Sequence, residues 1–201
     1  MNTENNTAAK PTGARAIRPS LSFYHANAKG TGSAIKMRLH PAHDFTDGSI
    51  MLKIANQMTI GNVAGPNPTF ATFDWENAMT VKLDFCDLCQ MLQVFRGECE
   101  SINDGKGLYH RSPLGTTSIR LKHLIDPVSG YLLEIYRSSP KGQEPDRHAG
   151  MLFKPVEALG LSESIAGAMY LVGFGIPMVI QHDTTAYRAQ VKEMSDVAAC
   201  A

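Results

Sequence analysis

Two cysteines, Cys86 and Cys89, have the Cys-x-x-Cys spacing found in redox and zinc sites. A zinc site needs a second Cys or His pair at close spacing, whereas Cys99 and His110 follow singly. A thioredoxin-like site needs a strand–helix–strand unit with parallel strands, and the pattern around this pair is that of antiparallel strands. We therefore expect both cysteines to pack inside a helix, without a metal or any other cofactor.

Other motifs of common enzymes are missing from the sequence. The glycines of residues 29–34 (KGTGSA) lack the Lys-Ser/Thr ending of a phosphate-binding loop. No Gly-x-Ser-x-Gly sequence occurs, the seven histidines are scattered, and the acidic residues do not form paired carboxylates on one strand. The expectation is a protein without catalytic residues that is not an enzyme.

Cationic side chains alternate with apolar ones in three segments, residues 33–40, 49–55 and 117–125. This period of two is typical of a half-buried β-strand, which turns its apolar side chains inward and the others outward. The outward cations are Lys36, Arg38, Lys53, Arg120 and Lys122. Cations at strand spacing can follow a phosphate backbone, although alternating charges more often only solvate a sheet face.

Aromatic residues near these segments could stack on unpaired bases, each stacked base contributing about 1–3 kcal/mol. The candidates are Phe23, Tyr24, Phe73, Trp75, Tyr109, Tyr131 and Tyr136. Trp75 is the only tryptophan, and its position between a strand and a helix favours a place in the core over a stacking role. Tyr131 shares a strand face with Leu133 and is expected to be buried, whereas Tyr136 lies on the opposite face and suits a surface role.

The composition limits how the chain could bind nucleic acid. Its 201 residues are 43% hydrophobic, enough for one domain with a core, and 19 basic residues balance 19 acidic ones. Binding must therefore come from local cations and stacking, because the net charge supplies no general attraction. The sequence predicts a disordered arm at 1–20 without the apolar segment of a secretory signal, a domain at 21–180 and a tail at 181–201. Four cysteines are ordinary for a reducing cytoplasm.

The elements that must position these side chains follow an order of strands and then a helix, which occurs twice. The first half is expected to hold strands at 21–28, 33–40, 49–55 and 69–83 and a helix at 84–96. The second half is expected to hold an extended segment at 99–111, strands at 117–125, 131–137 and 151–156, and a helix at 156–173. Asp84 is a suitable N-cap for the first helix, whose predicted apolar face consists of Phe85, Leu88, Cys89, Leu92 and Phe95.

The order of particular segments resembles the Whirly family of single-stranded-DNA-binding proteins. The matching segments are KG at 29–30, GSIMLKIA at 48–55, FDWENAMTVKLDFCDLCQML at 73–92, SIRLKHLIDPVSGYLLEIY at 118–136 and MLFKPVEALGLSESIAGAMYLVGFGIP at 151–177. The resemblance implies an α+β fold of two antiparallel four-stranded sheets, each followed by a helix. Kinetoplastid mitochondrial guide-RNA-binding proteins and, at half size, a eukaryotic transcriptional coactivator share that fold.

The resemblance also implies a function and an assembly. The family binds single-stranded DNA with little sequence preference, as a homo-oligomer that is plausibly a tetramer with the helices at its centre. Bases would lie in the crevice between sheets of neighbouring subunits. The residues chosen for nucleic-acid binding are Lys29, Lys36, Arg38, Lys53, Phe73, Trp75, Tyr109, Arg120, Lys122 and Tyr136.

Four departures from the family pattern stand out in this sequence. Thr31 replaces the second lysine of a Lys-Gly-Lys start, the loop at 60–69 and the closing helix are both longer, and no organelle transit peptide is evident. The last point favours a bacterial or phage relative that acts in the cytoplasm with the nucleoid. Two alternatives stay open: an RNA-binding or annealing protein on the same fold, and a structural module that has lost nucleic-acid binding.

Overall fold

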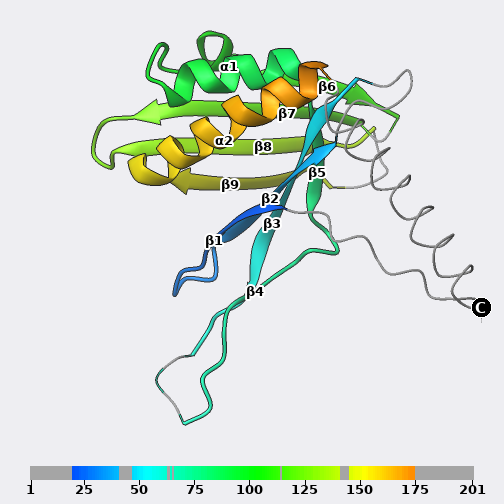
Figure 1. Cartoon of the computed structure of the whole chain (residues 1–201). Coiled ribbons are helices and arrows are strands. Elements are labelled where there is room, and N and C mark those ends of the chain that lie inside the picture. The colour runs from blue at the N-terminus through cyan, green and yellow to red at the C-terminus, as the bar shows by residue number, and fades with distance from the viewer. Residues whose placement is uncertain are drawn as a thin grey trace, which may run out of the picture.

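Two antiparallel β-sheets and two α-helices make up the computed structural model, which describes residues 20–40, 47–62, 64, 66–113, 115–140 and 145–174 (Figure 1). Sheet 1 contains β1 (Leu21–His25), β2 (Ser33–His40), β3 (Ser49–Thr59), β4 (Thr72–Phe73) and β5 (Met79–Leu83). Sheet 2 contains β6 (Leu108–Ser112), β7 (Gly115–Leu124), β8 (Gly130–Ser138) and β9 (Arg147–Phe153). The helices are α1 (Phe85–Phe95), α2 (Pro155–Phe174) and a short 3₁₀ turn η1 (Ile102–Gly105). The expected α+β fold is confirmed.

The strand order is simple in both sheets. In sheet 1 the long β3 pairs with β2 on one side and with β5 on the other, and the two-residue β4 joins β3 near its end. In sheet 2 the four strands pair in sequence order. Each sheet thus has a four-stranded ladder followed by one helix, as the sequence predicted.

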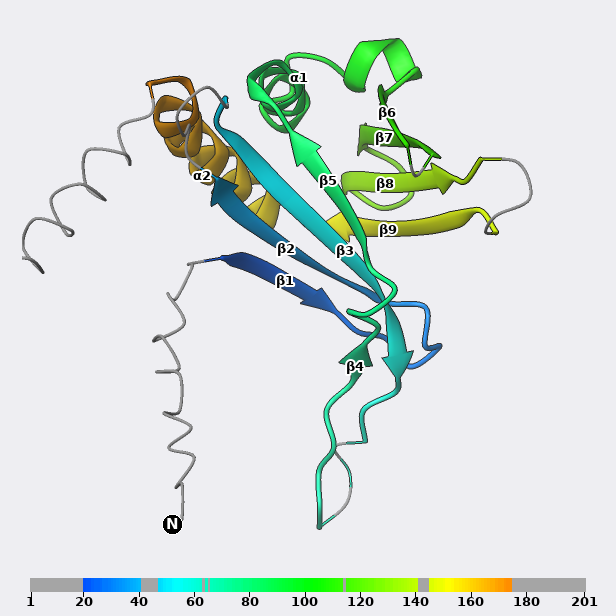
Figure 2. The same ribbon diagram turned by 90° about the vertical axis from the view of Figure 1, so that its right-hand side faces the viewer.

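The alternation of apolar and polar residues along the strands explains which side chains form the core. Ile35, Leu52 and Ile54 point to the inner face of sheet 1, and Ile119 and Ile135 point to the inner face of sheet 2, all with at most 1% of their surface exposed. Both helices contact β7, β8 or β9 and pack against each other, so they cover the inner face of sheet 2 (Figure 1). Within the described residues, no helix lies over the outer face of either sheet (Figure 2).

Helix α1 begins where the sequence predicted. The Asp84 carboxylate accepts a hydrogen bond from the Asp87 backbone N–H at 2.9 Å, and the Asp87 carboxylate accepts one from the Asp84 backbone N–H at 3.1 Å. The predicted apolar face was wrong at its start, because Phe85 is 47% exposed. The first helical turn extends beyond the edge of the core, and Asp87 is buried there instead.

Strand β9 and helix α2 begin earlier than predicted. The sequence placed a strand at 151–156, whereas β9 covers Arg147–Phe153, because its first residues pair with β8 despite their polar character. Lys154 separates the strand from the helix, and Pro155 occupies the first helical position, where its missing N–H costs no hydrogen bond. No helix among the described residues is long and apolar enough to cross a membrane.

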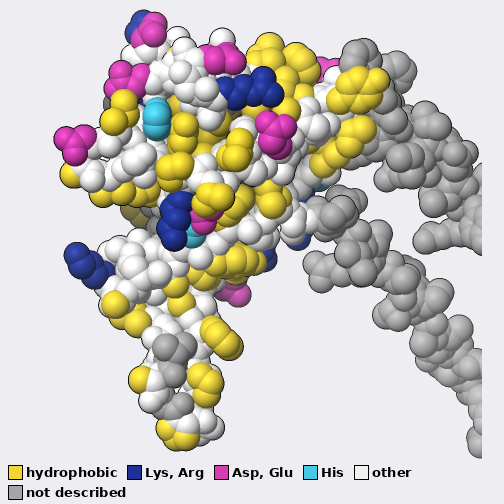
Figure 3. All heavy atoms as spheres, turned by 60° about the vertical axis from the view of Figure 1, so that its left-hand side comes forward, with side chains coloured by type: hydrophobic (Ala, Val, Ile, Leu, Met, Phe, Trp, Pro, Cys, Tyr) yellow, Lys and Arg dark blue, Asp and Glu magenta, His cyan; other side chains and the backbone are white. Residues whose placement is uncertain are grey.

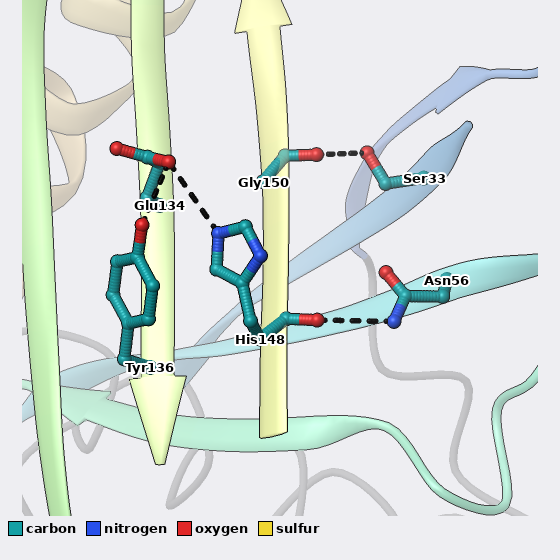
Figure 4. A network of polar contacts seen from close by, with 6 residues as sticks. All are labelled: Ser33, Asn56, Glu134, Tyr136, His148 and Gly150. Carbon is teal, nitrogen blue, oxygen red and sulfur yellow. Dashed lines mark hydrogen bonds and ion pairs between the residues drawn. The ribbon is translucent and has the colours of Figure 1, made fainter. Parts of the chain in front are cut away.

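Strand β9 also joins the two sheets. The Ser33 hydroxyl donates a hydrogen bond to the Gly150 carbonyl at 2.7 Å, and the Asn56 amide donates one to the His148 carbonyl at 3.1 Å (Figure 4). These bonds use the free edge of β9 and therefore fix sheet 2 against β2 and β3. The predicted arm at 1–20 and tail at 181–201 lie outside the described residues, apart from Ser20.

An ion pair holds the edge strand β1 to helix α2. His25 Nε2 lies 2.9 Å from Glu157 Oε1, and the Lys154 backbone N–H donates to Glu157 Oε2 at 2.8 Å. Burial alone would raise the pKa of Glu157, but these hydrogen bonds and the positive charges of His25 and Lys154 outweigh burial and lower it below the ordinary value of 4.5. The ionised carboxylate therefore stabilises the folded state above about pH 4.5, and this stabilisation is lost as the pH falls through the lowered pKa.

The Glu157→Gln variant is expected to melt a few degrees below the wild type at neutral pH, since the ionised partner of His25 is lost. The gap should close as the pH is lowered below 4.5, because the wild-type carboxylate then becomes neutral as well. Melting curves of both proteins between about pH 7 and pH 3 measure this. Glu163→Gln, at an exposed position of the same helix, is the matched control. A gap that stays constant with pH would contradict the prediction.

Candidate nucleic-acid interface

Two lysines lie side by side on the outer face of sheet 1. Lys36 in β2 is directly opposite Lys53 in β3, and Arg38 lies two residues further along β2 in the same outward direction. Like charges directly opposite each other on a sheet destabilise it unless something offsets their repulsion. The predicted orientation of these three cations is confirmed.

The indole of Trp75 offsets the repulsion between the two lysines. Lys36 Nζ lies 4.1 Å from the centre of the Trp75 ring and Lys53 Nζ lies 5.9 Å from it. A cation over an aromatic face is attracted by about 0.5–2 kcal/mol, depending on its solvation. Trp75 is half-buried on the outer face, so the preference for a core position was wrong. The chain doubles back after β3 and carries Trp75 over that outer face.

Two more rings complete an aromatic cluster, defined here as Tyr24, Phe73 and Trp75. The Tyr24 ring centre lies 5.7 Å from that of Phe73 and 6.4 Å from that of Trp75. Tyr24 is 54% exposed and is aligned across the sheet with Ala34 and Ala55, whose small side chains leave room for the rings on this face. The sequence offers Tyr24 as one of several rings that could stack on bases, but only the strand pairing places it beside Phe73.

The loop that carries Trp75 is held by local hydrogen bonds. The Asp74 backbone N–H donates to the Asn56 carbonyl at 2.9 Å. The Asp74 carboxylate accepts hydrogen bonds from the Asn77 backbone N–H at 3.1 Å and from the Asn77 side-chain amide at 2.9 Å. These hydrogen bonds, first the one from the Asn77 side chain, lower the pKa of Asp74. The tryptophan is thus presented by an ordered turn.

The turn between β1 and β2 places Lys29 at one end of sheet 1. The buried Gln57 side chain accepts hydrogen bonds from the backbone N–H groups of Asn27 at 2.9 Å and Gly32 at 3.1 Å, and donates one to the Asn27 carbonyl at 3.0 Å. The Asn27 side chain accepts a further bond from the Lys29 backbone N–H at 3.0 Å. The exposed Lys29 therefore extends from a fixed turn.

The outer face of sheet 2 carries a row of side chains across all four strands. Tyr109, Ser118, Tyr136 and His148 are aligned from β6 to β9. The rings of Tyr136 and His148 are stacked with centres 4.3 Å apart, and the Arg120 guanidinium lies 5.3 Å from the Tyr136 ring. Tyr109 is 60% exposed, and the row borders a hollow of about 220 Å³.

The carboxylate of Glu134 lies beside this row of side chains. The Tyr136 hydroxyl donates a hydrogen bond to Glu134 Oε1 at 2.9 Å, and His148 Nε2 lies 3.4 Å from the same oxygen (Figure 4). Burial, followed by the hydrogen bond and the charge of Glu134, raises the pKa of Tyr136, so its hydroxyl stays protonated at neutral pH. The sequence did not single out His148 or Glu134, since only the pairing of β8 with β9 places them beside Tyr136.

The five outward cations do not form one surface. Lys36, Arg38 and Lys53 lie on sheet 1, whereas Arg120 and Lys122 lie on sheet 2. Figure 3 shows lysines and arginines scattered among apolar patches rather than gathered in one basic stripe. Each sheet therefore offers its own group of rings and cations.

The cysteine pair was expected to be buried in the helix, and this was wrong for Cys86, which is exposed. Burial raises the pKa of the half-buried Cys89, and the negative charges of Cys86 and Asp84 add to the effect. A raised pKa leaves less of the reactive thiolate at neutral pH. Within the described residues, no group of three or more His, Cys, Asp or Glu side chains could hold a metal ion.

Comparisons with known proteins relate the chain to others by structure alone. No family model and no curated protein matches its sequence. The crystal structure of WHY3 from Arabidopsis thaliana aligns with a TM-score of 0.60 and 13% identity, covering 87% of this chain and 99% of WHY3. WHY1 from Arabidopsis thaliana aligns with a TM-score of 0.60 and 16% identity, covering 87% of this chain and 94% of WHY1. The plant transcriptional regulator PBF-2 aligns with a TM-score of 0.58 and 16% identity, over 84% of this chain and 89% of PBF-2. These are Whirly proteins, and the chain therefore has the Whirly fold that its sequence predicted.

Proposed function

We propose that this chain binds single-stranded nucleic acid, preferably DNA, on the outer face of sheet 1. One observation carries the proposal: the aromatic cluster includes an indole with two lysine ammonium groups within 6 Å of its centre. Rings that stack on bases next to cations that contact phosphates are the combination that single-strand binding requires. The Whirly fold supports the proposal, since the family named for it binds single-stranded DNA.

Little sequence preference follows from the chemistry of these groups. Every base has a π-face, so stacking on Tyr24, Phe73 or Trp75 tolerates any base. The net charge of zero limits the number of phosphate contacts, and the affinity should therefore fall only gently with salt.

We also propose a homo-oligomer, a tetramer, in which sheet 1 of one subunit faces sheet 2 of the next. The division of rings and cations between two sheets supports this, because a strand between subunits could contact both groups. The exposed apolar residues Val156, Leu159 and Tyr170 on α2 support an assembly through the helices. Such a protein would act with the nucleoid in the cytoplasm of a bacterial or phage-infected cell, in replication, recombination, repair or transcription.

The single tryptophan makes a direct test available. Because Trp75 is the only tryptophan in the chain, quenching of its fluorescence by oligothymidylate reports binding at the aromatic cluster itself. We expect a strand of about 30 nucleotides to quench it and the corresponding duplex to leave it unchanged. Competition with an RNA of the same sequence then separates DNA from RNA preference. Absence of quenching and of any anisotropy change with a labelled strand at micromolar protein would favour a structural module that does not bind nucleic acid.

The Glu134→Gln variant is expected to bind the single strand about fivefold more tightly than the wild type. The change removes a negative charge from a face that would approach phosphates. The repulsion between that charge and a phosphate is about 1 kcal/mol. Glutamine can still accept the hydrogen bond from Tyr136, so the local structure should persist. Fluorescence anisotropy measures the affinity, and Glu163→Gln on α2 is the matched control for a change in net charge. An unchanged affinity would show that sheet 2 does not approach the strand.

A further inference from the structure

Residues 58–62, 64 and 66–72 belong to an arm that projects beyond both sheets (Figures 1 and 2). Asn62 and Thr69 exchange two backbone hydrogen bonds of 2.9 and 2.8 Å, which pair the two sides of the arm. The hydroxyls of Thr59 and Thr72 lie 2.8 Å apart nearer its base. The arm is therefore a paired ribbon that continues from β3 and β4.

The arm is apolar and carries no charge. No Asp, Glu, Lys or Arg occurs in residues 54–73. Phe70 is 81% exposed, Met58 64% and Ile60 55%. At the bottom of Figure 3, the described part of the arm accordingly shows hydrophobic side chains and no charged side chain. Apolar side chains gathered on a projecting element mark a surface that contacts a partner.

The arm is continuous with the aromatic cluster. Phe73 stands at its base and belongs to the cluster through Tyr24, and Phe70 lies three residues before Phe73. On the other side of the arm, Ile60 lies against the turn that carries Lys29: a methyl group built on Gly30 would be 3.7 Å from Ile60 Cγ1. The base of the arm thus adjoins both a cluster ring and the turn that carries Lys29.

The residue paired with Phe70 on the other side of the arm has no side chain that could cover its ring. Gly61 lies there, and a Cβ added to Gly61 would be 2.8 Å from the Ala71 backbone nitrogen and 3.2 Å from the Phe70 carbonyl carbon. Only glycine fits such a close approach of the two backbones. The phenyl ring consequently has no cross-strand side chain to pack on.

We propose that the arm is a second stacking position for the same single strand, in which Phe70 stacks on a base and Lys29 contacts a phosphate. The proposal rests on the proposed function and extends its site beyond the aromatic cluster. Phe70 and Lys29 would together supply an aromatic ring and a cation, the two kinds of group that Trp75 and Lys36 bring together in the aromatic cluster. The absence of carboxylates from the arm allows a phosphate backbone to pass without repulsion. Continuity with the cluster favours a nucleic-acid strand over a second copy of the chain as the occupant.

Strands of two lengths test the proposal through Phe70→Ser. Oligothymidylate of about 6 nucleotides should fill the aromatic cluster alone, so its affinity and its quenching of Trp75 should equal those of the wild type. A strand of about 30 nucleotides reaches the arm, and its affinity should fall about 5- to 150-fold, as expected for the loss of one stacked base. Met58→Ser, which removes an exposed apolar side chain of the same arm but no ring, is the matched control and should bind both strands normally.

A second variant places the fluorescent probe on the arm itself. In the full chain carrying Trp75→Phe and Phe70→Trp, the only tryptophan lies on the arm. We expect the long strand to quench its fluorescence and the short strand to leave it unchanged. Equal affinity of Phe70→Ser and wild type for the long strand would overturn the proposal. So would a smaller molar mass of Phe70→Ser in light scattering without nucleic acid, since the arm would then contact a second copy. If the wild type binds neither strand, the proposed function itself fails, which is a separate outcome.

Discussion

The double variant Tyr24→Ala/Trp75→Ala is expected to bind single-stranded DNA at least about 30-fold more weakly than the wild type. Each base stacked on an aromatic ring contributes about 1–3 kcal/mol, so the loss of two rings removes at least about 2 kcal/mol. The loss also leaves Lys36 opposite Lys53 without the indole that attracts both ammonium groups. Anisotropy of a labelled strand measures the affinity, because the variant has no tryptophan to observe.

The salt dependence of the same variant separates stacking from charge. Both lysines remain, so the slope of log affinity against log salt should stay close to that of the wild type while the affinity falls at every salt concentration. Phe85→Ala, which removes a partly exposed ring of α1, controls for the loss of an aromatic side chain elsewhere. An affinity within twofold of the wild type would mean that bases do not stack on the cluster.

The Phe153→Ala variant is expected to lose about 3–5 kcal/mol of the free energy of unfolding. Phe153 is fully buried at the end of β9, and its ring centre lies 5.2 Å from that of Phe23 and 6.2 Å from that of Phe95. One side chain therefore connects the edge strand of sheet 1, sheet 2 and helix α1. Alanine would leave a cavity where these three elements meet, and the surrounding structure cannot close it fully.

Urea unfolding or thermal melting measures the loss, which corresponds to a fall of about 6–20 °C in melting temperature for a chain of this size. Phe85→Ala is the matched control, because Phe85 is 47% exposed and its removal should cost no more than about 1 kcal/mol. Phe153→Leu keeps most of the buried volume and should lie between the two variants, so it serves if the alanine protein does not fold. A melting temperature of Phe153→Ala equal to that of Phe85→Ala would contradict the role of Phe153 in joining the elements.

Local patterns determined the elements and the direction of most side chains. Residues 33–40 form β2 with the predicted bounds, and Lys36 and Arg38 face outward as predicted. Asp84 and Asp87 determine the start of α1 because their hydrogen bonds act within one helical turn. Such features depend on neighbours in the sequence, which is why a single sequence was enough to predict them, along with the order of strands and helices that identified the fold.

Contacts between distant segments were decided only by the tertiary structure. The indole of Trp75 lies over Lys36, almost forty residues earlier, because β3 brings the chain back across β2 and the Asp74 turn holds the loop there. The pairing of β8 with β9 likewise brings His148 to Tyr136. The alternation of a sequence predicts on which face of a strand a residue lies, but it does not predict which strand pairs with that strand. The sequence by itself therefore determined the rings and cations available to this protein, and strand pairing decided which of them form a site.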